Sequence, residues 1–176
     1  EALFRPFKEA GPPTRFDVNR MLNEALDSAD IPDDVEVVCH YDQQLPLVNC
    51  SFLLLDIFLE LITNACKAME RRQLRQLEVI SRSEQMDGLP WIRVEISDTG
   101  KGISYNKLKH LWNLFQPSDE GLGFGLWWMR TYIERQGGAI ECHSQPDKGA
   151  TFIIRLPASE DRSQRSENKS QRSEDR

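Results

Sequence analysis

The stretch that most constrains this chain is residues 91–103, which read WIRVEISDTGKGI. Its first half alternates apolar and polar residues with the period of a half-buried strand. Continuing this period places Asp98 on the apolar side, where an unpaired carboxylate is costly. Gly100 and Gly102 follow in a turn whose backbone can approach a ligand closely. A lone acceptor beside such a turn suits the donor edge of a base such as adenine, whereas the simpler interpretation is that Asp98 caps local N–H groups.

The length and charge of the chain narrow its class. With 176 residues it is expected to form one domain with a real core, and its net charge of −6 without a basic stripe argues against a nucleic-acid partner. No apolar run approaches the roughly 18 residues that span a membrane. We therefore expect a cytoplasmic domain, although the full-length protein could be attached to a membrane. Since the sequence has neither a signal peptide nor a starting Met, we expect a piece of a larger protein.

The cysteines point to a reducing compartment. They form no CxxC pair and have no metal-ligand spacing. Three of them lie inside apolar patterns, so we expect reduced, buried thiols in a cytosolic protein. The four are Cys39, Cys50, Cys66 and Cys142.

The distribution of apolar and polar residues divides the chain into three parts. Residues 1–15 are expected to be a linker or the end of an upstream element, residues 16–157 a folded domain, and residues 158–176 a disordered polar tail. The tail has no large apolar residue and repeats SQRSE, so it cannot bury enough surface to order itself; a phosphorylated or partner-binding tail is the alternative. Within the domain we expect helices at 16–29, with Asp17 as N-cap, 52–69, 104–111 and 124–136, and strands at 35–40, 76–81, 91–98, 139–144 and 150–156.

The strongest helix signal is at residues 52–69. Glu60, Asn64 and Lys67 recur at i, i+4 and i+7, so they share one face within an arc of about 60°. Such a face is usually only solvated. Asn is a poor residue inside a helix, however, and the alanines beside it leave room for something to lie close. A different, broad apolar face is expected to contain Leu55, Phe58, Leu59, Ile62 and Cys66.

A glycine-rich loop precedes the last predicted helix. Gly121, Gly123 and Gly125 alternate in FQPSDEGLGFGL, and a loop of this kind offers unpaired N–H groups and a positive dipole end to an anion. Glycines also serve tight packing, so this motif alone is weak. The order of four motifs is stronger evidence: Glu-x-x-x-Asn-Ala-x-Lys-Ala, then Asp-x-Gly-x-Gly, then Gly-x-Gly-x-Gly-Leu, then Gly-x-Thr-Phe.

In this order the motifs resemble the catalytic, ATP-binding domain of sensor histidine kinases of two-component systems. The wider family includes gyrase B, the heat-shock chaperone ATPases and MutL. ELITNACKAM resembles the N box, VEISDTGKGI the G1 box, LWNLF the F box, GLGFGL the G2 box and GATFIIRLP the closing strand. The resemblance covers about residues 16–157. It implies a two-layer α/β sandwich of the Bergerat type, with a mixed, mainly antiparallel sheet packed on helices and a nucleotide under a mobile lid.

The resemblance also implies roles for single residues. Asn64 would hold Mg²⁺ through its side-chain oxygen, since magnesium keeps water and phosphate in its shell, and Lys67 would reach a phosphate. Asp98 would accept the adenine amino group, with Thr151 supporting it through a water. The adenine wall would be shaped by Gly100, Gly102 and Ile103, and the other ATP-binding residues would be Ala68, Phe115, Gly121, Leu122, Gly123, Phe124, Gly125 and Leu126.

Glu60 is the expected catalytic residue. Many kinases have Asn at this first N-box position. In gyrase-type ATPases a Glu there activates water, whereas in a kinase it would polarise the attacking imidazole or order a metal-bound water. The lid departs from the kinase pattern, because it holds Asp119 and Glu120 but no Lys or Arg. Arg130 could substitute for the missing cation, and its alternative role is a solvated or ion-paired helix residue.

The histidines limit what the chain can do alone. His40 and His143 fall on expected strands and His110 on an expected short helix, so the phosphoacceptor helices are expected outside this chain. We therefore predict a monomeric catalytic domain that transfers the γ-phosphoryl group of Mg-ATP to a histidine on an absent dimerisation domain, with a response-regulator receiver domain acting downstream. The alternatives are a gyrase- or MutL-type ATPase that uses Glu60 to activate water, and a degenerate, non-catalytic ATP-binding module.

Overall fold

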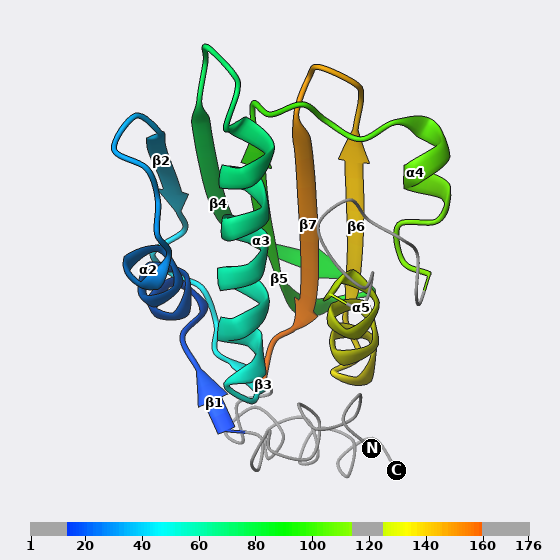
Figure 1. Cartoon of the computed structure of the whole chain (residues 1–176). Helices are drawn as coiled ribbons and strands as arrows, with labels where there is room; N and C mark the ends of the chain where they lie inside the picture. Colours follow the sequence, from blue (N-terminus) through cyan, green and yellow to red (C-terminus); the bar gives the residue numbers. More distant parts are fainter. Residues whose placement is uncertain (1–13, 114–124, 160–176) are drawn as a thin grey trace, which may run out of the picture.

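The computed structural model describes residues 14–113 and 125–159. Five strands form a sheet in the order β2-β4-β5-β7-β6, and helices α2, α3 and α5 lie against one face of it (Figure 1). The elements are β1 (Thr14–Phe16), α2 (Val18–Ser28), β2 (Glu36–Tyr41), β3 (Val48–Cys50), α3 (Leu53–Met69), β4 (Gln76–Met86), β5 (Leu89–Asp98), α4 (Tyr105–Lys109), α5 (Gly125–Arg135), β6 (Ala139–Ser144) and β7 (Ala150–Pro157).

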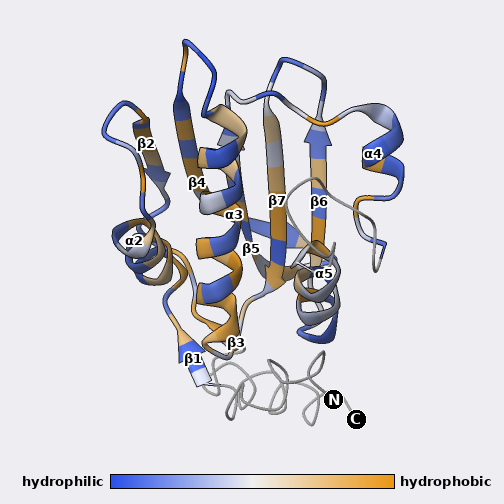
Figure 2. Cartoon of the chain, in the orientation of Figure 1, coloured by the Kyte–Doolittle hydropathy of each residue, from blue (hydrophilic) through white to orange (hydrophobic). Residues whose placement is uncertain are grey.

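The sheet is mixed and mainly antiparallel. Only β2 pairs in parallel, with β4, while β4 with β5, β5 with β7, and β6 with β7 are antiparallel pairs. The strands beside α3 alternate hydrophobic and hydrophilic residues (Figure 2), as expected for a sheet with one covered face. This two-layer arrangement confirms the predicted fold class.

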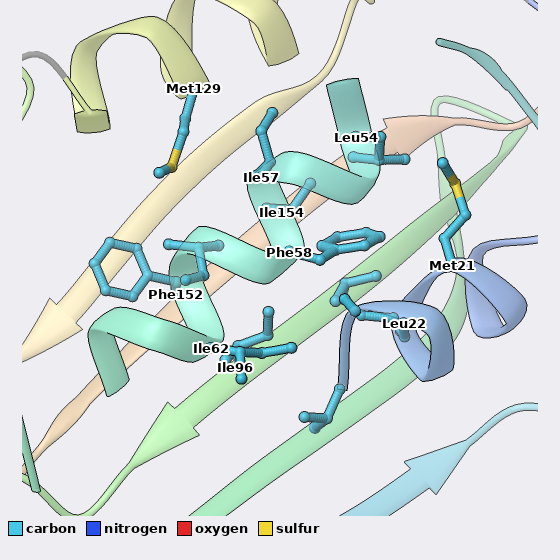
Figure 3. Packing of buried hydrophobic residues seen from close by; sticks show 14 of the residues in the cluster. Met21, Leu22, Leu54, Ile57, Phe58, Ile62, Ile96, Met129, Phe152 and Ile154 are labelled. Atoms are coloured by element: carbon cyan, nitrogen blue, oxygen red, sulfur yellow. The ribbon is translucent and has the colours of Figure 1, made fainter. Parts of the chain in front are cut away.

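Helix α3 forms the centre of the core. Its buried side chains come in neighbouring pairs about four residues apart, including Leu54, Phe58 and Ile62, and they pack between the sheet and the flanking helices (Figure 3). Leu55 and Leu59 are only half-buried. Both nevertheless pack against the core, so they lie at the margin of the predicted apolar face and not at its centre. Because α3 is covered by α2 as well as by the sheet, the buried arc is wider than a single stripe and is rotated away from these two residues.

The beginning of the domain differs from the prediction. Phe16 belongs to strand β1, which pairs with β3, a three-residue strand that the sequence did not reveal. Such short strands carry too few residues for a periodic signal. The predicted N-cap is confirmed, since the Asp17 carboxylate accepts the N–H groups of Asn19 and Arg20 at 2.9 and 3.2 Å.

Strand β4 is longer than predicted. It continues past Ser81 to Met86, and the hairpin to β5 closes through only two residues, Asp87 and Gly88. Their φ angles are 51° and 76°, as the tight hairpin turn with two positive φ angles requires. The last helix, α5, agrees with its predicted bounds within one residue at each end.

All four cysteines are free thiols, in agreement with a reduced state. Cys50 and Cys66 are buried and Cys142 is half-buried, but Cys39 is exposed. The prediction of a buried thiol fails at Cys39 because β2 forms an edge of the sheet. In the described ranges, no helix is long and apolar enough to cross a membrane.

Candidate nucleotide-binding site

Asp98 ends strand β5 on the face that the helices cover. It continues the buried series of Ile92, Val94 and Ile96 and is itself half-buried. Burial raises the pKa of Asp98, and hydrogen bonds from the N–H groups of Gly100 and Ala150 lower it in part. The Gly100 bond to Oδ1 measures 2.7 Å, so Asp98 does cap local N–H groups. A carboxylate has about four acceptor positions, which leaves capacity for a ligand.

The turn after Asp98 packs directly on the end of helix α3. We call residues 99–102 the G1 turn. A Cβ added at Gly100 would lie 2.7 Å from both the Cβ and the carbonyl oxygen of Ala68, and the Lys101 N–H donates to the same oxygen at 3.0 Å. The space beside Ala68 is therefore filled by the G1 turn, which joins the predicted N-box and G1-box segments.

The β6–β7 turn holds the G1 turn from the other side. The Gly149 N–H donates to the Gly100 carbonyl at 3.1 Å, and the Asp147 N–H donates to the Lys101 carbonyl at 2.9 Å. Gly149 has a φ of +77°, and a Cβ there would overlap the carbonyl oxygen of Asp98. The sequence showed residues 146–149 only as a hairpin turn and did not reveal this role in the site.

Gly102 and Ile103 complete this wall. Gly102 has a φ of +65°, and an added Cβ would overlap the carbonyl oxygen of Gln145. The Ile103 N–H donates to the Ser144 hydroxyl at 2.8 Å, which in turn donates to the Gly149 carbonyl. These two hydrogen bonds hold Ile103 against the β6–β7 turn.

The polar face of α3 borders the start of helix α5. Glu60 and Lys67 are exposed, Asn64 is half-exposed, and Nδ2 of Asn64 lies 3.5 Å from Oε1 of Glu60. A Cβ added at Gly125, the first residue of α5, would lie 3.7 Å from the same Glu60 oxygen. The structure thus brings the candidate catalytic carboxylate next to a helix N-terminus, where backbone N–H groups attract anions.

Thr151 is not brought to Asp98. It pairs with Ser97 across the β5–β7 ladder, and the two hydroxyl oxygens lie 2.9 Å apart. Residues directly opposite each other share a face, so Thr151 lies on the face opposite to Asp98, and the partner of Asp98 is Ala150. The predicted support of Asp98 by Thr151 is corrected on this point, because one step along a strand reverses the face.

Two thiols that were not predicted near Asp98 lie close enough to feel its charge. Burial raises the pKa of Cys142, on β6, to about 12, and the charge of Asp98 adds to this shift. The pKa of Cys66, on α3, is raised by the same two causes. Both thiols are therefore neutral at physiological pH. Their only sequence signal was their place in apolar patterns.

Some of the remaining predicted residues lie in the described ranges and others lie outside them. Leu126 is half-buried against the core, and Arg130 pairs with Glu134 at 2.7 Å, which supports its interpretation as an ion-paired helix residue. His40 and His143 lie on strands β2 and β6, and His110 follows helix α4. The lid residues lie outside the described ranges: Phe115, Asp119, Glu120, Gly121, Leu122, Gly123 and Phe124.

The donor set fits a magnesium ion held mainly by its nucleotide. Glu60 and Asn64 offer oxygen atoms on adjacent turns of α3. Within residues 14–113 and 125–159, no group of three or more His, Cys, Asp or Glu side chains could hold a metal. Magnesium is commonly bound by one or two protein oxygens together with phosphates and water.

A carboxylate at a strand end, a polar helix face and a glycine-opened helix thus define a nucleotide-binding α/β sandwich. Residues 51–160 match the family described as histidine kinase-, DNA gyrase B- and HSP90-like ATPases, and the chain belongs to this family. It is 36% identical over 106 residues to the sensor protein FixL of Bradyrhizobium diazoefficiens, covering 60% of this chain and 20% of FixL. It is 30% identical over 174 residues to the adaptive-response sensory kinase SasA of Synechococcus, covering 93% of this chain and 42% of SasA. The chain therefore spans less than half the length of either relative.

Solved structures share the fold. The catalytic domain of histidine kinase ThkA superposes with a TM-score of 0.70 at 22% identity, covering 84% of this chain and 99% of that domain. Full-length ShkA in complex with AMPPNP superposes with a TM-score of 0.68 at 23% identity, covering 82% of this chain and 31% of ShkA. The family match and the sensor kinase relatives, together with this shared fold, confirm the resemblance to histidine kinase catalytic domains.

Proposed function

We propose that this chain is the ATP-binding catalytic domain of a sensor histidine kinase and that this domain lies in the cytoplasm. It transfers the γ-phosphoryl group of Mg-ATP to a histidine on a dimerisation domain outside this chain, and a receiver domain acts downstream. The observation that carries the proposal is the packing of Gly100 against Ala68. This packing joins the adenine acceptor Asp98 to the polar face of α3 in one site.

The residues of the site divide the work by position. Asp98 accepts the amino group of adenine, while Gly100, Gly102 and Ile103 form the wall against which the base lies. On the polar face of α3, Lys67 would reach a phosphate and Asn64 would help to hold the magnesium ion of Mg-ATP.

Phosphoryl transfer depends mostly on positioning and on neutralising charge. Magnesium supplies neutralisation of phosphate charge when it is bound. Glu60 lies beside the start of α5, where it can polarise the attacking imidazole or orient a water. Glu60 therefore affects the rate of phosphoryl transfer and has little effect on ATP affinity.

The test supplies the cognate dimerisation helices in trans and measures phosphorylated histidine and free phosphate together. The chain alone should bind ATP with little turnover, and the added helices should become phosphorylated. Glu60→Gln should slow transfer by about tenfold or more with nearly unchanged ATP affinity, the signature of a transition-state role. Glu134→Gln, at an exposed glutamate of α5 that pairs with Arg130, is the matched control and should transfer normally.

Two outcomes would contradict the proposal. Steady phosphate release by the chain alone, abolished by Glu60→Gln, would identify a hydrolase of the gyrase or MutL kind. ATP binding without transfer to the supplied helices would identify a non-catalytic module, in which the acidic residues Asp119 and Glu120 of the lid mark the lost step.

A further inference from the structure

We propose that Arg72 and Asp147 form a clamp that holds the G1 turn in the geometry that accepts adenine. Neither residue is expected to touch the nucleotide, so both are positioning residues. The inference rests on the proposed function, because it concerns ATP affinity at the Asp98 site. Figure 1 shows the end of α3 and the β6–β7 turn at the same end of the sheet.

The clamp is made by two hydrogen bonds between the same two residues. Nη1 of Arg72 lies 2.8 Å from Oδ1 of Asp147, and Nη2 donates to the Asp147 backbone carbonyl at 3.1 Å. A guanidinium that donates twice to one partner fixes direction as well as distance. The pair therefore sets the position of the β6–β7 turn relative to the loop that follows α3.

The clamp closes a ring of contacts around the G1 turn. Asp147 donates its N–H to the Lys101 carbonyl at 2.9 Å, and Lys101 donates its own N–H to the Ala68 carbonyl at 3.0 Å. Arg72 is tied to the end of α3, since its N–H donates to the Met69 carbonyl at 2.9 Å. The ring therefore runs from α3 to the G1 turn, to the β6–β7 turn, and back to α3 through the ion pair.

The clamp lies at the wall of a pocket. This pocket of about 540 Å³ is lined by residues of the loop after α3 and of the β6–β7 turn, among them Arg72 and Asp147, and by Thr99 of the G1 turn. Loss of the pair should therefore loosen the G1 turn at Thr99 while leaving the core of the domain intact.

Asp147 allows a clean substitution. Its φ is 61°, in the left-handed region that Asp and Asn tolerate better than most residues. Asp147→Asn keeps this backbone preference and removes the charge, so its effect reports the ion pair rather than the turn.

The same loop provides a matched control. Arg75 lies 2.7 Å from Asp34, in a pair whose Asp is 64% exposed, compared with 77% for Asp147. Asp34 lies just before β2, whereas Asp147 donates directly to the G1 turn. Asp34→Asn therefore removes a comparable surface pair without breaking the ring around the G1 turn.

The experiment measures ATP affinity by calorimetry and hydrogen exchange without nucleotide for the parent, Asp147→Asn and Asp34→Asn. An exposed ion pair is worth up to about fivefold in an equilibrium constant. Asp147→Asn should weaken ATP binding by about threefold to fivefold at low salt, and the difference should shrink at high salt. Exchange at residues 98–103 should accelerate in Asp147→Asn alone, while both variants keep similar melting temperatures.

The outcomes separate this inference from the proposed function. Equal ATP affinity and equal hydrogen exchange in Asp147→Asn and Asp34→Asn would refute the positioning role of the clamp, whether or not the parent protein binds ATP. Absence of ATP binding by the parent would remove the proposed function, and the exchange measurement would still decide whether the pair holds the G1 turn. A double variant with Arg72→Gln that adds no loss beyond Asp147→Asn would support direct coupling of the two residues.

Discussion

The β4–β5 and β6–β7 hairpin turns both contain an aspartate and a glycine at positive φ, but only the second turn contacts the nucleotide site. The first closes through Asp87 and Gly88 with φ angles of 51° and 76°, and the second contains Asp147 and Gly149 with φ angles of 61° and 77°. A Cβ added at Gly88 would meet nothing within 4 Å, whereas one at Gly149 would overlap the Asp98 carbonyl oxygen. One glycine therefore meets only a backbone requirement, and the other also allows two segments to touch.

Their positions on the sheet explain the difference. The β4–β5 turn lies where β5 begins, and the β6–β7 turn lies where β5 ends at Asp98. Only the second turn can therefore lean on the G1 turn and build a wall of the nucleotide site. An aspartate and a glycine in sequence predict a turn. They do not show whether the turn only joins two strands or also forms a wall of a binding site.

The largest expected difference comes from adding one methyl group to each turn. Gly88→Ala should cost about 1 kcal/mol from backbone strain alone and leave ATP affinity unchanged. Gly149→Ala has the same strain and must also displace Asp98 and the G1 turn, so we expect a larger fall in melting temperature and at least about tenfold weaker ATP binding. Thermal unfolding and calorimetry on both variants provide the measurement. Equal losses in the two variants would show that proximity to Asp98 has no consequence.

Asp98→Asn should separate binding from stability. An acceptor in a partly dry site contributes about 1.5–3 kcal/mol, so ATP affinity should fall by at least about tenfold. Burial raises the pKa of Asp98 in the folded protein, so its contribution to stability is present below the unfolded pKa and is lost as pH rises through the folded value. The nucleotide-free variant should therefore melt higher than the parent at pH 7, and this gain should vanish in acid.

Asp42 offers the opposite case: it follows strand β2 and contacts Ser83 of β4, in the first hairpin. Its carboxylate accepts N–H groups of Gln44 and Ser83 and the Ser83 hydroxyl, which lower its pKa. Its contribution to stability is present above the unfolded pKa and is lost as pH falls through the folded value. Asp42→Asn should thus lower the melting temperature at pH 7 without changing ATP affinity. A higher melting temperature for Asp42→Asn at pH 7, or a lower one for Asp98→Asn, would contradict the predicted effects of these two carboxylates on stability.

The smallest expected effect is from lengthening the first turn. Inserting Gly-Ser between Asp87 and Gly88 adds little closure entropy and touches no part of the site, so ATP affinity should stay within about twofold of the parent. The same insertion between Asp147 and Lys148 should weaken binding strongly, because it displaces the N–H groups donated to the G1 turn. Titration of both proteins with ATP checks the pair, and a large loss from the first insertion would break the comparison.

Much of the site could be predicted because its signals are local. The alternation of Ile92, Val94 and Ile96 placed Asp98 on the covered face, and the spacing of Glu60 and Asn64 placed them on one face of α3. The order of the motifs also indicated the family. Periodicity works here because each of these residues belongs to a long, regular element.

The errors arose where a neighbouring segment decides the outcome. Thr151 was assigned to the site although the β5–β7 register turns it to the other face. Leu55 packs against the core only at its margin, because α2 and the sheet shift the buried arc of α3. Cys39 has the apolar neighbours of a buried residue but lies on an edge strand. Register, helix rotation and strand order are not encoded in the period of a single segment.

By itself, then, the sequence determined which side chains share a face and which turns demand glycine. Only the tertiary structure decided that Gly100 packs on Ala68, that Gly149 touches the Asp98 backbone, and that Arg72 reaches Asp147. The physical reason is that backbone periodicity orients a residue relative to its own strand or helix. Contacts between segments far apart in the chain depend instead on how the elements pack together, and those contacts build the walls of the nucleotide site.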